Sequence, residues 1–150
     1  MVIMNTLVDL IFKGQFEAID FGFINSLIPL ASEKRFMYPE NTVVKSSEDI
    51  IQIFKANSYF DFVLSANYVD LLKKRIPNIF INIGRDSSNV DILFFFDLKD
   101  LGTDYKSELS FLHKWSSTFK KKYHFDSFIC RMDGEEDGDN YYYQENWISI

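Results

Sequence analysis

The side chains with the most chemistry gather in an acidic run near the C-terminus, where five carboxylates fall within seven residues, those of Asp133, Glu135, Glu136, Asp137 and Asp139. An EF-hand calcium loop places oxygen ligands at positions 1, 3 and 5, a glycine at position 6 and a bidentate glutamate at position 12. Counted from Asp133, the run keeps the early ligands and Gly138, but position 12 is Gln144, which has no carboxylate. The preceding segment also has the pattern of a strand, not of a helix. The run is therefore better interpreted as a solvated acidic loop or as a protein-binding surface.

Aromatic residues follow the acidic run directly, at 141–143 and at Trp147. Clustered carboxylates steer basic partners into encounter, and Tyr and Trp are the side chains that most often anchor interfaces. The predicted partner-binding residues are Asp133, Glu135, Glu136, Asp137, Asp139, Tyr142 and Trp147. The alternative is that Tyr141 and Tyr143 alternate into a sheet and serve only packing.

Other reactive side chains give weaker signals. Asp97 and Asp100 bracket the end of an apolar segment, where paired carboxylates suit metal or acid–base chemistry, but a helix-entry turn explains them more simply. His113 and His124 are eleven positions apart and are expected to be surface or packing residues. Cys130 lies in an apolar run and is expected to be an inert buried thiol. We predict no catalytic residue, no metal site and no cofactor.

Composition excludes several classes of function. The sequence has no Gly-rich phosphate loop, GxSxG, HExxH or CxxC motif. Its net charge of −6 disfavours nucleic acid and anionic membranes as partners. A single cysteine excludes an internal disulfide and suits a reducing compartment. We see no signal peptide and no transmembrane segment, so we expect a cytoplasmic protein.

The elements that must position these residues centre on 79–132. The apolar segments 79–83 and 92–96 flank a polar loop and predict a β-hairpin. The uninterrupted apolar run at 92–96 predicts a central strand covered on both faces, which requires a layer of helices. A stripe with steps of three and four predicts a helix over 105–123 with Asp104 as its N-cap. Residues 128–130 then return to the sheet.

The first half of the chain is less strongly patterned. Residues 5–13 favour a short helix with a buried strand as the alternative, because short apolar runs do not discriminate between the two. The other predicted segments are a helix at 16–28, a turn at 32–35, an edge strand at 36–38, a weak strand at 42–44, a helix at 47–56 capped by Ser46, a strand or a tight helical continuation at 59–64, and a helix at 67–72. Together these predict one α+β domain over residues 1–150, with a mainly antiparallel central sheet and helices packed on it.

The elements from residue 79 onward resemble those of small bacterial immunity proteins of contact-dependent growth inhibition and related polymorphic-toxin systems. The resemblance lies in their order: a hairpin ending in Phe94–Leu98, a helix striped with Leu, Trp and Phe, the segment Phe128–Asp133, and an acidic, aromatic tail. It implies a cytoplasmic, non-enzymatic inhibitor that binds one cognate toxin C-terminal domain, often a basic nuclease. The alternatives are a small-molecule-binding or enzymatic α+β domain with a cleft near Asp97 and Asp100, and a calcium-responsive interaction module.

Overall fold

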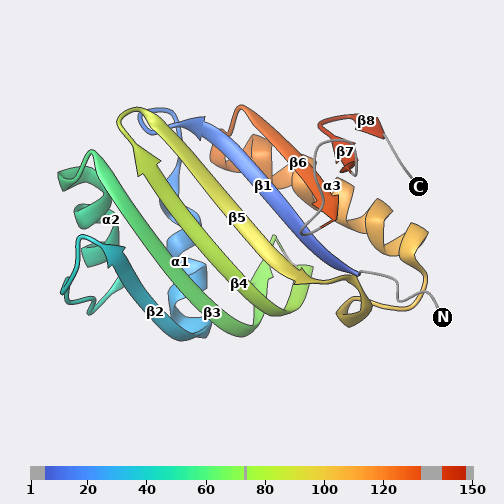
Figure 1. The fold of residues 1–150 in the computed structure, drawn as a ribbon, viewed down its shortest axis with the longest axis horizontal. Coiled ribbons are helices and arrows are strands. Elements are labelled where there is room, and N and C mark those ends of the chain that lie inside the picture. The colour runs from blue at the N-terminus through green and yellow to red at the C-terminus, as the bar shows by residue number, and fades with distance from the viewer. Residues whose placement is uncertain (1–5, 73, 133–139, 148–150) are drawn as a thin grey trace.

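The structure is a computed structural model that describes residues 6–72, 74–132 and 140–147. Through them runs one antiparallel sheet of eight strands in the order β2-β3-β4-β5-β1-β6-β7-β8 (Figure 1). The strands are β1 (Leu7–Gln15), β2 (Ala31–Tyr38), β3 (Tyr59–Leu71), β4 (Lys74–Asp86), β5 (Asn89–Asp97), β6 (Ser127–Met132), β7 (Asn140–Tyr143) and β8 (Asn146–Trp147). The helices are α1 (Ile24–Leu27), α2 (Ser47–Ala56) and α3 (Tyr105–Tyr123), with 3₁₀ turns η1 (Phe21–Phe23), η2 (Ile28–Leu30) and η3 (Leu98–Asp100). The predicted α+β class with a mainly antiparallel sheet is confirmed.

The core lies between the sheet and the helices on one of its faces. Phe12 of β1 and Phe94 of β5 meet Phe119 of α3 with ring centroids 4.7 and 5.6 Å apart. Trp115 stacks on Phe119 and donates its indole N–H to the carbonyl of Leu71. Burial of these aromatic rings supplies most of the driving force that fixes α3 on the sheet. None of the helices in the described ranges is long and apolar enough to cross a membrane.

Several predicted elements are confirmed. The hairpin forms between β4 and β5, with Ser87 in the left-handed region at φ 56° in its turn. Helix α2 starts where the side chain of Ser46 accepts a hydrogen bond from the N–H of Asp49. Helix α3 starts in the same way at Asp104, and β6 returns to the sheet beside β1. The strongest patterns in the sequence therefore identified the elements that carry the core.

Other predictions are wrong. Residues 5–13 form a strand from Leu7 onward, because Val8, Leu10 and Phe12 alternate inward. The helix predicted at 16–28 begins only at residue 21 and continues to residue 30, since Asp20 accepts from the N–H of Gly22 and starts a 3₁₀ turn there.

The turn predicted at 32–35 is part of edge strand β2, whose charged residues suit an exposed edge. Residues 42–44 form no strand. The helix predicted at 67–72 is the end of β3, which pairs with β4 on both sides of Pro77. This part of β4 extends beyond β5, so the proline removes no hydrogen bond to a second neighbour.

Candidate functional site

The sheet has one covered and one open face among the described residues. Figure 1 shows the helices behind the sheet, with its other face toward the viewer. Strand β5 is central, as predicted, but the described elements cover only one of its faces: Ile92, Phe94 and Phe96 are buried against the helices, whereas Leu93 and Phe95 lie half-buried on the opposite face. That opposite face is called the open face below.

Strand register arranges the open face in rows. The first row, called the apolar row, is apolar except for Asn82 and joins Val63, Asn82, Leu93, Ile11 and Ile129 across five strands. The next row toward the hairpin turn joins Asp61, Gly84, Asp91 and Lys13. On the other side of the apolar row, Phe80 lies opposite Phe95 and is 37% exposed. The open face thus places an apolar stripe directly beside an acidic one.

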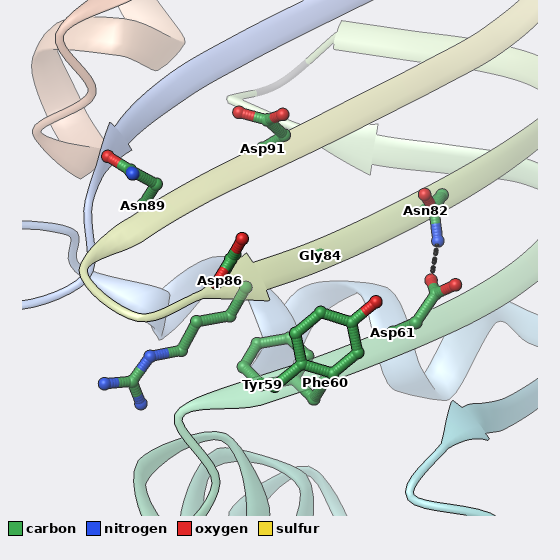
Figure 2. A pocket seen from close by; sticks show the side chains of 9 residues that line it. Tyr59, Phe60, Asp61, Asn82, Gly84, Asp86, Asn89 and Asp91 are labelled. Atoms are coloured by element: carbon green, nitrogen blue, oxygen red, sulfur yellow. Dashed lines mark hydrogen bonds between the residues drawn. The ribbon is translucent and has the colours of Figure 1, made fainter.

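A hollow of about 330 Å³ lies in the acidic row, at Gly84. Figure 2 shows Asp61, Asp86 and Asp91, from three neighbouring strands, around the bare backbone of Gly84. The amide of Asn82 donates to Asp61 Oδ1 and to the carbonyl of Phe62, so Asp61 is held in place. No ion pair within the described part of the chain joins these three carboxylates to a cation. The hollow is therefore a built, negatively charged recess.

Two tyrosines extend the hollow toward the edge of the sheet. Tyr38 of β2 and Tyr59 of β3 meet edge to face with ring centroids 5.3 Å apart. Each is about half exposed, at 50% and 54%. Large aromatic side chains with a polar tip are the residues that interfaces use most as anchors. The open face therefore combines aromatic, apolar and acidic groups within one surface.

Arg85 borders the hollow, but its charge is used elsewhere. The guanidinium donates to the carbonyls of Phe54, Asn57 and Ser87, at 2.9, 3.2 and 2.7 Å. It also lies 3.5 Å over the ring of Phe16. These contacts tie the C-terminal end of α2 to the hairpin turn and direct the cation away from the three aspartates.

The predicted acidic run lies outside the described residues: this applies to Asp133, Glu135, Glu136, Asp137 and Asp139. Of the two aromatic residues predicted with it, Trp147 is 38% exposed and packs on the ring of His113 at 5.0 Å. Tyr142 is fully buried, and its hydroxyl lies 2.8 Å from Ser116 Oγ. Strand β7 thus turns Tyr142 inward and Tyr143 outward, the reverse of the alternation considered from the sequence.

Gln144 has a structural role in the turn between β7 and β8. Its Oε1 accepts from the N–H of Phe128, and its Nε2 donates to the carbonyl of Asp126. Its own carbonyl lies 2.8 Å from His113 Nε2. Gln144, the residue at position 12 of the EF-hand pattern, therefore holds this turn against β6 and α3.

The remaining reactive side chains are used structurally. Asp97 caps η3 through the N–H of Lys99. Partial burial raises the pKa of Asp97, but hydrogen bonds from Thr6 and Lys99 and the Lys99 charge outweigh it, so the pKa is lowered. Asp100 accepts from Asn78, and burial raises the pKa of the Cys130 thiol to about 12. Within the described ranges, no group of three or more His, Cys, Asp or Glu side chains is arranged to hold a metal ion.

Sequence reasoning missed the residues of the open face, because six strands contribute them and only the register brings them together. One signal was present, namely the continuous apolar run at 92–96. The run predicts burial on both faces, whereas the described elements cover only one of them.

Comparison with known proteins gives one family and one solved structure. A model of the PABL017 Cdi1I immunity protein matches residues 3–147. Curated proteins give no match. A chain in the crystal structure of the toxic C-terminal tip of CdiA from Pseudomonas aeruginosa in complex with immune protein superposes with a TM-score of 0.61. The alignment has 14% identity and covers 97% of this chain and 98% of that one, a likeness that shows a shared fold.

Proposed function

The chain belongs to the PABL017 Cdi1I immunity protein family, and from that premise we propose that it neutralises the C-terminal tip of a cognate CdiA-type toxin by tight one-to-one binding. The observation that carries this proposal is the family match over residues 3–147. The fold shared with a chain of a CdiA–immune protein complex supports it. We further propose that the inhibitor acts in the cytoplasm.

The charge of the chain favours a basic toxin, and we propose a nuclease. A nuclease active site is built to bind phosphates, so it attracts an acidic protein. With a net charge of −6, this chain can be steered to such a site and can compete with the nucleic acid for it. Inhibition then follows from occupation of the site and needs no chemistry in the inhibitor.

Part of the toxin contact is proposed to come from the tail. Its carboxylates at 133, 135, 136, 137 and 139 would supply steering, and the exposed indole of Trp147 would supply an apolar anchor. Tyr142 was predicted as a contact residue, but its burial suits a supporting role behind Trp147, whose ring lies 5.1 Å from it. We propose that Tyr142 positions the tail and does not touch the toxin.

We propose a non-enzymatic protein. Asp97, the main alternative for catalysis, caps η3 with its oxygens. The Cys130 thiol, with a pKa of about 12 and complete burial, is not a nucleophile at neutral pH. Each of the strongest catalytic candidates in the sequence thus has a structural role.

Growth rescue tests the proposal. The gene immediately upstream is read, and the C-terminal domain of its product is expressed alone, with this chain, and with a Glu135→Lys/Glu136→Lys/Asp137→Lys variant. We expect the domain to arrest growth, this chain to restore it and co-purify, and the variant to bind more slowly. A toxic domain that arrests growth equally with and without the chain contradicts the proposal.

A further inference from the structure

Gly84 is a glycine that the fold does not require. A Cβ added at Gly14 would lie 3.2 Å from Ile19, one at Gly22 would lie 3.0 Å from Asp20, and one at Gly102 would displace the carboxylate end of the Glu108 side chain. At Gly84 the nearest atom would be the carbonyl oxygen of Phe60 at 3.9 Å, an ordinary contact, and φ is outside the left-handed region. Glycine within a strand weakens it and often marks a place where another molecule approaches closely.

The missing side chain keeps the hollow on the open face empty. Gly84 lies between Asp61 and Asp91 in its row, and a side chain there would project into the 330 Å³ recess. Apolar side chains of the same face lie beside the recess. Leu93 and Phe95 are half-buried and Phe80 is 37% exposed, although no described element packs over them. Gly84 costs strand β4 stability, and the same face of the sheet exposes apolar rings. A partner that covers this face and fills the recess explains both features.

The charges of the recess indicate which kind of side chain would bind in it. Asp61, Asp86 and Asp91 are unpaired with any cation in the described part of the chain, and Lys13 on the next strand is the nearest basic residue in the row. A lysine or arginine side chain would bring charge to the carboxylates and lay its aliphatic stem along the apolar row. A free anion or an acidic segment would be repelled.

We propose that the open face is a toxin-docking surface and that the hollow at Gly84 receives a lysine or arginine side chain of the toxin. This proposal rests on the proposed function, since the toxin is its occupant. It adds contact residues to those proposed in the tail. Tyr38 and Tyr59 form the rim of this surface and anchor the same partner through their half-exposed rings.

Filling the hollow tests the proposal. Gly84→Arg places a bulky cation in the recess, and Ser110→Arg adds the same charge to the exposed side of α3, behind the sheet. Binding of each variant to the purified upstream toxin domain is measured by calorimetry, with thermal melting as the control for folding. We expect Gly84→Arg to melt like the wild-type chain and to lose about 100-fold in affinity, the cost typical of a blocked interface centre. Ser110→Arg should bind like wild type.

A second pair of variants keeps the test decisive if Gly84→Arg does not fold. Asp86→Lys/Asp91→Lys reverses two exposed carboxylates of the recess, and Glu17→Lys/Glu40→Lys makes the same change in net charge in exposed turns. We expect only the first pair to lose affinity strongly. Equal affinity for both pairs, or unchanged affinity of folded Gly84→Arg, would overturn the docking surface and leave the proposed function intact.

The remaining outcomes also have one meaning each. A wild-type chain that does not bind the toxin domain contradicts the proposed function and, with it, the docking proposal. The lysines of α3 make a second copy of this chain the rival occupant of the acidic face. Light scattering would reveal such self-association as wild-type dimers that Gly84→Arg disrupts. If toxin affinity is the same for both proteins, the open face is a self-association surface and the proposal is overturned.

Discussion

Single residues around Tyr142 join the tail to the core. Its hydroxyl contacts Ser116 Oγ, its ring meets His113 edge to face at 4.7 Å, and Trp147 packs beside both. His113 in turn lies against the carbonyl of Gln144. This network holds β7 and β8 against α3.

Tyr142→Phe tests whether that network is structural. The variant removes one buried hydroxyl, while Ser116 keeps its hydrogen bond to the carbonyl of Leu112. We expect the free energy of unfolding to fall by about 1 kcal/mol, the usual net value of one hydrogen bond. Denaturant unfolding measures this, and toxin affinity should change little. A strong loss of affinity at unchanged stability would show that Tyr142 is a contact residue.

Cys130 predicts a specific dependence of stability on pH. Its thiol pKa rises from 9.0 to about 12 on burial. Between these values the unfolded chain binds fewer protons than the folded one, so stability falls as pH rises. This group contributes at most about 1.4 kcal/mol per pH unit. We therefore expect the unfolding free energy of Cys130→Ala to fall less steeply with pH than that of the wild-type chain between pH 9 and 11. An identical slope in both proteins would contradict the buried, protonated thiol.

At the scale of elements, the central strands carry both stability and the docking surface. Gly84→Ala should raise the free energy of unfolding by about 0.5–1 kcal/mol, because alanine loses less conformational freedom on folding and meets no close atom. Gly14→Ala is the matched control and should lower stability, since its Cβ would press on Ile19 at 3.2 Å and Phe125 at 3.3 Å. Thermal melting separates the two. Destabilisation by both variants would mean that the fold requires Gly84.

Sequence patterns predicted elements correctly where the local pattern fitted only one kind of element. The stripe of α3, the cap of α2 and the alternation in β4 each had one interpretation. The apolar spacing of 67–72 predicts a helix, but long-range pairing with β4 makes this region part of a strand. The apolar spacing of residues 7–12 fits both a helix and a strand, and pairing with β5 and β6 makes them a strand.

The candidate site was less predictable than the fold. The acidic run was visible as a local cluster of one residue type. Asp61, Gly84 and Asp91 are separated by up to thirty positions, and only strand register places them in one row. No local pattern encodes such a row, so the open face could not have been found from one sequence.

At the scale of the whole molecule, charge is distributed unevenly between the two faces. Lys106, Lys114, Lys121 and Lys122 are exposed on α3, whereas the hollow on the open face is acidic. A basic toxin would therefore approach the open face. We expect the association rate constant to fall about tenfold between 20 and 200 mM salt, as for other electrostatically steered pairs. Stopped-flow measurement checks this, and a rate independent of salt would exclude steering.

The most direct test of the central claim is the mass and affinity of the complex with the upstream toxin domain. The purified chain and the domain are mixed, and light scattering and calorimetry report stoichiometry and dissociation constant. The proposed function predicts a stable one-to-one complex with nanomolar or tighter affinity, together with loss of toxin activity. Two proteins that elute separately at micromolar concentration, with the toxin fully active, would contradict it.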